Sequence, residues 1–485
     1  MTRFAKIVCT LGPSSSDEQT IRKLVTAGMD VARLNFSHGT HESHSNLITI
    51  IRRLSEEMKK PIAILQDLQG PKLRVGELPA EGIELRTGMI VNLYAIESAS
   101  PQQIAGEIYL PLDVPNLARA VKLGNRILLD DGHLELQVTG VEGDAVITKV
   151  TLGGLLTSHK GVNLPGADLK IPIPTEKDMV DLQFGLEQNV DFVAISVVHT
   201  AAEIKTVRNL IQTYSPNKKA PGIIAKLERP EAIKNLHEIM HEADGVMVAR
   251  GDLGVETSPS QVPTIQKEII HMANRHAKIV ITATQMLDSM IHNPRPTRAE
   301  ASDVANAVFD GTDAVMLSGE TASGSYPIES VQMMDSIVRE AEAHYEQWGQ
   351  AVDFPKDALQ DDAIAMTRAA RELAHDRAVV NCAVLTQTGR TALLMSKARP
   401  KVPIMAFTPN KNVYNLTNMY WGVTPVMIDF VDSLEGVVQC VDEVLQTDHH
   451  IKKGQQIILI TGFPLPAFHL PNLALLHNIG EGVNQ

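Results

Sequence analysis

The run MVARGDLGVE (247–256), read together with IIAKLERPE (223–231), decides the fold, because each is an apolar stretch that ends abruptly in charged and glycine residues. Runs bounded in this way are typical of buried parallel strands whose carboxyl ends carry the chemistry. The earlier run delivers Lys226 and Glu228, and the later one delivers Asp252. A lysine and two carboxylates at neighbouring strand ends predict a site for a metal ion and a phosphorylated anion.

Similar apolar runs recur along the chain and alternate with amphipathic segments of helical periodicity. They are KIVCTLG (6–12), VARLNFS (31–37), IAILQDL (62–68), FVAISVV (192–198), GIIAKLE (222–228), GVMVARGDL (245–253), KIVITATQ (278–285) and DAVMLSGET (313–321). A (β/α)8 TIM barrel contains eight strands that alternate with helices, which is the number found here. The sequence therefore predicts an α/β fold built on such a barrel.

The alternation stops between the third and fourth of these runs. Residues 75–165 instead contain short alternating segments and turn signals, such as LELQV (134–138) and AVITKV (145–150), which predict an inserted β-rich domain. The insertion leaves the rim where barrels of this kind keep their active sites, so it is well placed to close over the mouth as a lid. The alternative is a passive decoration.

A further α/β unit follows the barrel after a charged, helix-rich stretch near 335–360. Its predicted strands are VVNCAVLTQTG (379–389), KVPIMAF (401–407), VTPVMI (423–428) and QQIILITG (455–462). The predicted organisation is a barrel domain of residues 1–74 and 166–340, a β-barrel lid of residues 75–165 and a C-terminal α/β regulatory domain of residues 341–485.

Bulk composition restricts the function classes. The chain has 485 residues and a formal net charge of −13, which argues against nucleic acid or an anionic membrane as the main partner. The three cysteines, Cys9, Cys382 and Cys440, are odd in number and far apart, so no disulfide framework is indicated. Without a leader-like or membrane-spanning run, we expect a cytoplasmic protein.

Polar and charged side chains follow most of the other predicted strands as well. The candidates are Arg33, Asn35, Ser37, His38, Asp67, Lys72, Arg74, Thr282, Thr284, Gln285, Ser318 and Glu320. Arginine at a strand end suits phosphate oxygens, whereas a single threonine in a strand is ordinarily only a β-former. His38 fits a polar rim residue better than a base. Together these positions mark one end of the barrel as functional.

The two opening runs allow a specific hypothesis and a plain alternative. A lysine at the end of an apolar strand is costly unless it meets an anion, but Lys226 can also form a structural ion pair with Glu228. Glu228 and Asp252 are suited to Mg²⁺, which uses few carboxylates and leaves positions for substrate and water. Gly251 allows close backbone approach to an anion, or is only a connecting turn.

The motifs taken together resemble the pyruvate kinase family. The matching segments are KIVCTLGPSS, VARLNFSHGTHE, DLQGPKLR, KGVNLPG, AKLERPEA, MVARGDLGVE, TATQMLDSM, NPRPTRAEASDVANAVFDGTDAVMLSGETA and LTQTGRTA. They stand in the family's order, cover essentially the whole chain and agree best from 223 to 322. The resemblance implies a barrel, a lid, a regulatory domain and a homotetramer.

The same resemblance implies phosphoryl transfer from phosphoenolpyruvate to ADP, giving pyruvate and ATP in the last step of glycolysis, with Mg²⁺ or Mn²⁺ as cofactor. By this resemblance Lys226 and Arg33 meet the phosphoryl group, Glu228 and Asp252 hold the metal, and the backbone of Gly251 and Asp252 receives the substrate carboxylate. Thr284 lies near the carbon that is protonated, and Ser318 and Glu320 match a proton-relay route. The resemblance also implies positions around a monovalent cation at Asn35, Ser37, Asp67 and Leu68, and nucleotide contacts from Arg74, Lys160 and His38.

One departure from the best-known family pattern concerns the monovalent cation. Potassium-requiring members carry a glutamate where this chain has Lys72, flanked by threonine and lysine where it has Leu68 and Gln69. The Lys72 version resembles the bacterial, potassium-independent branch. An ammonium carried by the protein can stand where K⁺ would otherwise balance the anionic substrate. We therefore expect activity without K⁺.

A second departure concerns an effector site in the C-terminal domain. LTQTGRTA resembles the phosphate-cradling loop of the family, which implies contacts from Thr386, Thr388, Gly389, Arg390 and Thr391. The closing segment TGFPLPAFHLPNLALLHNIG is rich in proline and bulky apolar residues, which disfavours a sugar bisphosphate. The expected activator is a sugar monophosphate or AMP, and the alternative is an unregulated enzyme.

Two other functions compete with this interpretation. A lyase that stabilises an enolate with Mg²⁺ would need the carboxylates and arginine, but not the inserted lid. A non-catalytic regulatory protein on the same scaffold is disfavoured because Lys226 and Asp252 are both present. The match of several long motifs at once favours the kinase.

Overall fold

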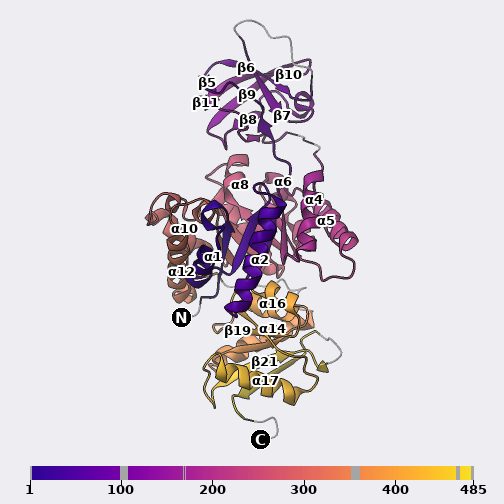
Figure 1. The fold of residues 1–485 in the computed structure, drawn as a ribbon, viewed down its shortest axis with the longest axis vertical. Helices are drawn as coiled ribbons and strands as arrows, with labels where there is room; N and C mark the ends of the chain where they lie inside the picture. The colour runs from indigo at the N-terminus through magenta and orange to yellow at the C-terminus, as the bar shows by residue number, and fades with distance from the viewer. Residues whose placement is uncertain are drawn as a thin grey trace.

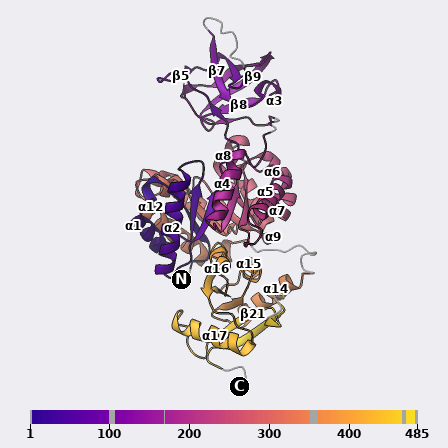
Figure 2. The same cartoon turned by 45° about the vertical axis from the view of Figure 1, so that its right-hand side comes forward.

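The computed structural model of the chain describes residues 3–98, 107–167, 169, 171–350, 361–465 and 470–481. Three bodies follow one another along the long axis of the molecule (Figure 1). The barrel lies in the middle, with the inserted β-rich domain at one end and the C-terminal domain at the other. Figure 2 shows the same order after rotation.

Eight parallel strands close into the central barrel, in the order β1-β17-β16-β15-β14-β13-β3-β2. Their bounds are β1 (Lys6–Leu11), β2 (Val31–Asn35), β3 (Ala63–Asp67), β13 (Phe192–Ile195), β14 (Gly222–Leu227), β15 (Gly245–Ala249), β16 (Ile279–Ala283) and β17 (Ala314–Leu317). Nearly every strand residue is buried, because one face fills the interior and the other lies under helices. The predicted α/β barrel is confirmed.

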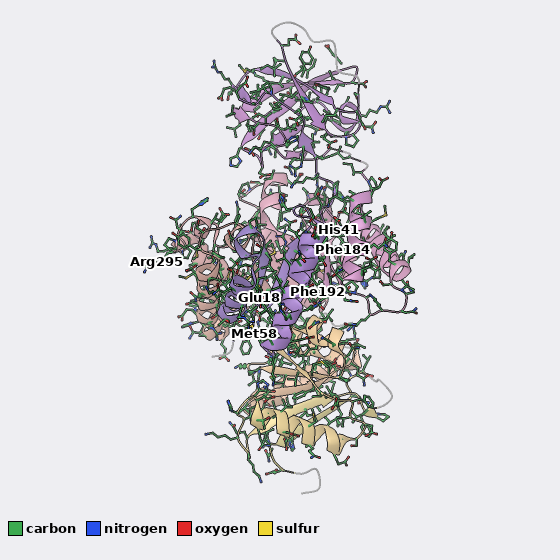
Figure 3. The ribbon with its side chains drawn as sticks, in the orientation of Figure 1. Glu18, His41, Met58, Phe184, Phe192 and Arg295 are labelled. Carbon is green, nitrogen blue, oxygen red and sulfur yellow. The ribbon has the colours of Figure 1, made fainter. Side chains whose placement is uncertain are left out.

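Amphipathic helices surround the barrel. They are α1 (Glu18–Ala27), α2 (His41–Glu57), α4 (Glu176–Glu187), α5 (Ala201–Tyr214), α6 (Pro230–Lys234), α7 (Leu236–Glu242), α8 (Arg250–Glu256), α9 (Val262–Arg275), α10 (Arg298–Phe309), α11 (Gly319–Ala322), α12 (Pro327–Ala343) and α13 (Tyr345–Trp348). Neighbouring helices contact through specific pairs. His41 of α2 stacks on Phe184 of α4, with ring centroids 4.2 Å apart, and both are marked in Figure 3.

The sixth predicted strand, 245–253, extends too far. The strand ends at Ala249, and Arg250 begins α8. The buried Arg250 guanidinium donates to the Thr284 carbonyl at 2.7 Å and pairs with Asp303 at 2.5 Å, so the chain turns inward at this residue. Gly251 and Asp252 consequently lie in the first turn of a helix rather than on a strand.

The inserted domain leaves the carboxyl end of β3 through Gly70, whose φ of +68° favours glycine. Its elements are β4 (Arg74–Val75), β5 (Ile83–Leu85), β6 (Ile90–Ala95), β7 (Ile108–Asp113), α3 (Leu117–Ala120), β8 (Arg126–Leu129), β9 (Leu134–Glu142), β10 (Ala145–Leu152), β11 (Gly154–Leu156) and β12 (Val162–Asn163). A seven-stranded sheet and a two-stranded sheet enclose a separate apolar core.

The C-terminal domain contains a five-stranded sheet in the order β20-β19-β18-β21-β22. Its elements are α14 (Asp362–Asp376), β18 (Cys382–Leu385), α15 (Arg390–Ala398), β19 (Ile404–Thr408), α16 (Lys411–Thr417), β20 (Val423–Met427), α17 (Leu434–Thr447), β21 (Gln456–Thr461) and β22 (Leu473–Asn478). Strand β22 pairs antiparallel with β21, and the sequence pattern did not predict it. Part of the predicted 335–360 stretch, 351–360, lies outside the described residues.

A buried charge cluster joins the C-terminal domain to the barrel. The fully buried Lys397 of α15 donates to the side chains of Asn274 and Asp313 in the barrel. Arg399 pairs with the same Asp313 carboxylate at 2.8 Å. Burial lowers the pKa of Lys397 to about 8, although the Asp313 charge opposes that shift. The shared carboxylate therefore compensates two cations that are shielded from water.

Replacing Asp313 by alanine is expected to lower the melting temperature, because two buried cations then lose their common partner. Removing one member of a buried ion pair costs about 3–5 kcal/mol. Differential scanning calorimetry measures the change, with the exposed turn substitution Asp144→Ala as the matched control. Equal melting temperatures for Asp313→Ala and the unaltered chain would contradict this role.

Candidate functional site

A cleft with a volume of about 220 Å³ lies where the carboxyl ends of the barrel strands meet the inserted domain. The barrel contributes Arg33, Lys226 and Glu228 to its lining, among others, and the inserted domain contributes Asp131 and Asn163. Because parallel strands all end at the same rim, residues far apart in sequence converge there. The structure thus brings seven of the predicted strand-end residues together in the lining of the cleft: Arg33, Asn35, Ser37, Lys72, Lys226, Glu228 and Asp252. The others, His38, Asp67, Arg74, Thr282, Thr284, Gln285, Ser318 and Glu320, are not part of that lining.

A buried carboxylate organises the floor of the cleft. Asp67, at the end of β3, is 1% exposed and pairs with Arg33 Nε at 2.7 Å and with Lys226 Nζ at 3.2 Å. Burial alone would raise the pKa of Asp67, but Lys226 and Arg33 outweigh it and hold that pKa below its ordinary value. Arg33 also donates to Thr10 Oγ1 at 2.8 Å, which fixes the guanidinium.

The Lys226 ammonium is held by three acceptors at the cleft. Besides the Asp67 pair, its Nζ donates to Ser196 Oγ at 2.7 Å and lies 3.0 Å from Glu228 Oε1. Burial would lower the pKa of Lys226, but the Asp67 and Glu228 charges raise it above its ordinary value. The ammonium therefore stays charged. Lys226 forms the ion pair with Glu228 and also lines the cleft.

Asp252 faces the open cleft from the first turn of α8, opposite Glu228. Desolvation by the surrounding protein, followed by the Glu228 charge, raises the pKa of Asp252 to about 6, although Lys226 opposes this. The other Glu228 oxygen accepts from the Val197 amide at 2.9 Å, so this carboxylate is fixed. Two carboxylates that repel each other at a cleft are a donor set suited to a divalent cation.

The loop after β16 adopts a strained backbone beside Asp252. Thr284 and Gln285 have φ of +67° and +51°, in a region that non-glycine residues rarely occupy. Thr284 Oγ1 accepts from the Gly251 amide at 2.8 Å, and Arg250 binds the loop carbonyls from beneath. Thr284 is therefore held next to Gly251, although neither residue is part of the cleft lining. Arg250 acts here as the anchor of both segments.

Ser318 and Glu320 follow β17 on the same rim, but neither lines the cleft. Glu320 is 1% exposed, and its carboxylate accepts from the backbone amides of Ser318 and Leu287 at 2.7 and 3.0 Å. Burial raises the pKa of Glu320, and these amides oppose that rise. In this structure the glutamate joins the loops after β16 and β17.

The predicted monovalent-cation positions divide into two groups. Asn35 and Ser37 line the cleft, and Asn35 Oδ1 accepts from the Ser37 amide at 3.1 Å. The Leu68 side chain is buried, and its carbonyl oxygen accepts from Ser196 at 2.7 Å. Lys72 lines the cleft without an ion pair in the described part of the chain, and desolvation and Arg74 lower its pKa.

The predicted nucleotide contacts lie at the edge between the barrel and the inserted domain. Arg74 Nη1 donates to the His159 carbonyl at 2.9 Å, and Lys160 pairs with Asp130 at 2.8 Å. Desolvation lowers the pKa of His38, and the Lys72, Arg74 and Arg33 charges lower it further. Of these basic residues only Lys72 and Arg33 line the cleft itself.

Sequence reasoning missed several residues of the cleft. Ser196 receives the Lys226 hydrogen bond, and it follows a strand whose apolar run FVAISVV gives no polar signal beyond this serine. Glu256 accepts from Asn163 Nδ2 at 2.9 Å and pairs with Arg229 at 3.5 Å. The Asn163–Glu256 contact links the inserted domain to α8. The two residues are far apart in the sequence, so no local sequence pattern predicts the contact.

The predicted effector loop lies in the C-terminal domain, at the start of α15. Thr386 is buried, and its Oγ1 accepts from the Gly389 amide at 3.0 Å, which closes the loop. Thr388 is exposed, Thr391 is buried, and Arg390 pairs with Asp361 at 3.1 Å. The loop is thus far from the cleft and forms its own turn.

Comparisons with known proteins follow the same division of the chain. A family model described as the pyruvate kinase barrel domain matches residues 2–331, and one described as the pyruvate kinase alpha/beta domain matches residues 362–474. The class is therefore that of α/β-barrel proteins with a carboxyl-end cleft and an appended α/β domain.

Individual relatives agree with the family models. A pyruvate kinase of Sporosarcina psychrophila is 40% identical over 99% of this chain and 81% of its own length. One of Clostridium perfringens is 41% identical over 95% of this chain and 96% of its own length. The crystal structure of a pyruvate kinase from Cryptosporidium parvum superposes with a TM-score of 0.90 at 34% identity, covering 98% of this chain and 96% of that one. The chain belongs to the pyruvate kinase family.

Two features, a cluster of metal-binding side chains and a membrane-spanning helix, are absent from the described residues. No set of three or more histidine, cysteine, aspartate or glutamate side chains forms a metal-binding group among them. None of the helices over the same ranges is long and apolar enough to cross a membrane.

Substituting Glu228 by glutamine is expected to lower the pKa of Asp252 below about 6, because the neighbouring negative charge is lost. Carbon-13 NMR of labelled aspartate carboxyls measures the titration, with Asp252→Asn identifying the signal. Glu231→Gln, on the nearby helix α6, is the matched control and leaves the titration in place. An unchanged midpoint in Glu228→Gln would contradict the assigned cause.

Proposed function

We propose that the cleft catalyses phosphoryl transfer from phosphoenolpyruvate to ADP, giving pyruvate and ATP, and that the residues described above perform it. The observation that carries this proposal is the Lys226 ammonium, held at the cleft by Ser196, Asp67 and Glu228. Membership of the pyruvate kinase family supplies the reaction. Phosphoryl transfer requires positioning and charge neutralisation, and this array provides both.

The cationic side chains bind and orient the anionic substrate. Arg33 and Lys226 are both fixed on Asp67, so neither must reorganise when a phosphoryl group arrives. Lys226 remains charged, because nearby carboxylates raise its pKa, and so stabilises the developing enolate oxygen. The backbone of Gly251 and Asp252 at the start of α8 is assigned to the substrate carboxylate, which would share the Gly251 amide with its present acceptor, Thr284 Oγ1. Closing over the cleft and excluding water is the role that we assign to the inserted domain.

Proton delivery to the enolate carbon is assigned to the loops after β16 and β17. Thr284 is held by its hydrogen bond with the Gly251 amide, next to the substrate position. Glu320 is buried, burial raises its pKa, and its two carboxylate oxygens accept from the Leu287 and Ser318 amides, so it links the two loops of this route. Ser318 lies between Thr284 and Glu320 in the sequence and follows β17 on the same rim. We assign this group to the proton route.

Glu228 and Asp252 are the residues that would hold Mg²⁺ or Mn²⁺. The fit rests on their facing carboxylates and on the raised pKa of Asp252, because a nearby cation relieves the repulsion that raises it. The metal, when bound, supplies positive charge to the phosphoryl oxygens. Glu228 remains oriented by the Val197 amide.

Lys72 is proposed to replace the monovalent cation. It projects into the cleft near Asn35 and Ser37, at the positions that resemblance connects with K⁺. Desolvation and Arg74 lower its pKa, so an added anionic substrate is a favourable partner for this ammonium. Asp67 is already neutralised by Arg33 and Lys226, which leaves little negative charge for K⁺ to balance.

The remaining partners are assigned on resemblance and placement. ADP and ATP are placed beneath the inserted domain, with Arg74, Lys160 and His38 as contacts. The loop Thr386, Thr388, Gly389, Arg390 and Thr391 is assigned a sugar monophosphate or AMP, and the assembly is assigned as a homotetramer. Hydroxyls and amides at the start of α15 support an anionic group at this loop.

Replacing Lys226 by methionine is expected to reduce kcat by about 10³-fold or more, because one preorganised charge is removed from the transition state. The assay is pyruvate formation from phosphoenolpyruvate and ADP with Mg²⁺. Lys234→Met, an exposed lysine on α6, is the matched control and keeps full activity. No turnover in the unaltered chain would reject the proposed reaction, and full turnover in Lys226→Met would reject the role of this lysine.

Activity without K⁺ is expected, because Lys72 supplies the positive charge. The same assay measures this activity in a buffer that contains neither K⁺ nor Na⁺. Lys72→Glu is expected to introduce a K⁺ requirement, so that added K⁺ raises its kcat/KM by about 10-fold or more. Lys72→Gln separates loss of the ammonium from gain of a carboxylate. A strong requirement for added K⁺ in the unaltered chain would overturn this assignment.

A further inference from the structure

The chain passes between the barrel and the inserted domain twice, and one buried carboxylate contacts both connecting segments. The first segment leaves the end of β3 through Gly70, and the second returns to the start of α4 (Figure 1). Asp178, in the first turn of α4, is 1% exposed. Its Oδ1 accepts from the Gly70 amide at 3.0 Å, and its Oδ2 accepts from the Thr175 amide at 2.9 Å. Asp178 therefore ties the outgoing segment to the returning one.

The contacts of Asp178 extend beyond the capping of its own helix. Thr175 and Asp178 form the capping box of α4, in which the Thr175 hydroxyl also donates to Asp178 Oδ2 at 2.7 Å. The next helix, α5, begins with an equivalent box, whose carboxylate, Glu203, accepts from the His199 amide at 2.6 Å. That donor lies directly before α5, whereas Gly70 lies 108 residues before Asp178. Helix capping does not require the bond to Gly70.

The outgoing segment is packed closely at Gly70. This glycine is buried, so its amide depends on Asp178 for an acceptor that water does not replace. A Cβ atom built on Gly70 would lie 2.8 Å from the Cβ atom of Ser196, the residue that follows β13. The segment therefore has little room to shift between its hydrogen bond with Asp178 and its contact with Ser196.

Ser196 connects this segment to the Lys226 ammonium. Its Oγ donates to the Leu68 carbonyl at 2.7 Å and accepts from Lys226 Nζ at 2.7 Å, and the serine is 3% exposed. A serine hydroxyl has a single proton, so its donation to Leu68 leaves the lone pairs free to face the ammonium. The placement of the Leu68 carbonyl thus determines the orientation of one acceptor of Lys226.

We propose that Asp178 is a positioning residue for Lys226. It holds Gly70 and, through the Leu68 carbonyl and Ser196, fixes one of the three acceptors of the ammonium. Asp178 is not part of the cleft lining, so it acts through this path rather than on the substrate. The segment that it holds continues into the inserted domain, and the path therefore connects the placement of that domain with the ammonium. The inference rests on the role of Lys226 in the reaction proposed for the cleft.

Steady-state kinetics of variants separate positioning from substrate binding. Asp178→Ala is expected to lower kcat about 10-fold, because a small displacement of the ammonium weakens its contact with the transition state. The KM for phosphoenolpyruvate is expected to stay within about twofold, because Arg33 keeps its contacts with Asp67 and Thr10. Glu203→Ala removes the same position of the α5 capping box, so it is the matched control for helix stability and keeps kcat.

A double-variant cycle tests whether Asp178 acts through Ser196. Ser196→Ala alone is expected to lower kcat about 10-fold, and adding Asp178→Ala is expected to lower it little further, because both changes interrupt one path. Independent effects would multiply to about 100-fold. Ser330→Ala removes another buried hydroxyl, on α12, and keeps kcat as the control. A multiplied loss, an unchanged kcat in Asp178→Ala, or an equal loss in Glu203→Ala would each overturn the proposal.

Chemical labelling of Lys226 tests the same path without turnover. Mass spectrometry of the full-length chain measures the rate at which acetic anhydride acetylates this lysine. Asp178→Ala and Ser196→Ala are each expected to raise that rate about threefold, because the ammonium loses a fixed acceptor. An unchanged rate in Asp178→Ala would overturn the positioning role even where the reaction itself is confirmed. Faster labelling in a chain that shows no turnover would support the path and reject the proposed reaction.

Gly70→Ala provides a second variant of the path. It replaces Asp178→Ala in both experiments if that variant melts below the assay temperature. The added methyl group would meet Ser196, so the segment is displaced at the same point. A lower kcat with faster labelling of Lys226 in Gly70→Ala would support the path, and unchanged values of both would overturn it.

Discussion

The buried Asp67 carboxylate is the interaction on which the cleft depends. It is 1% exposed and pairs with both Arg33 of β2 and Lys226 of β14, so its charge offsets the repulsion between these two cations. A carboxylate is tolerated there because both partners are in contact with it. Closure of the parallel barrel makes the contact possible, since β2, β3 and β14 bring their carboxyl ends to one rim.

The inserted domain and the C-terminal domain are attached to the barrel in different ways. At the cleft the contact includes the hydrogen bond from Asn163 Nδ2 to the Glu256 carboxylate. At the other end, Lys397 and Arg399 share Asp313 in a buried cluster. Breaking a buried ion pair costs about 3–5 kcal/mol, whereas a single hydrogen bond to a charged group contributes about 1.5–3 kcal/mol. At these contacts the C-terminal domain is therefore the more strongly attached of the two.

Much of the fold could be predicted because the barrel strands are buried on both faces and therefore appear as continuous apolar runs. The same runs end in polar residues, so Arg33, Lys226 and Asp252 could be proposed together before their distances were known. The limits of prediction were local. Arg250 begins a helix because its side chain reaches carbonyls of another loop, and β22 is defined by its pairing with β21. Ser196 was missed because one serine after an apolar strand carries no pattern.

The pairing of β1 with β17 determines how long the first barrel strands stay without their full set of partners during synthesis. Strand β1 (Lys6–Leu11) hydrogen-bonds β17 (Ala314–Leu317), so the barrel cannot close until most of the chain has been synthesised. At about 5–20 residues per second, the first three strands wait for tens of seconds on the ribosome. The inserted domain has its own core and is complete long before that. During this interval the open edge of β1 is the part of the nascent chain most in need of protection from other strands.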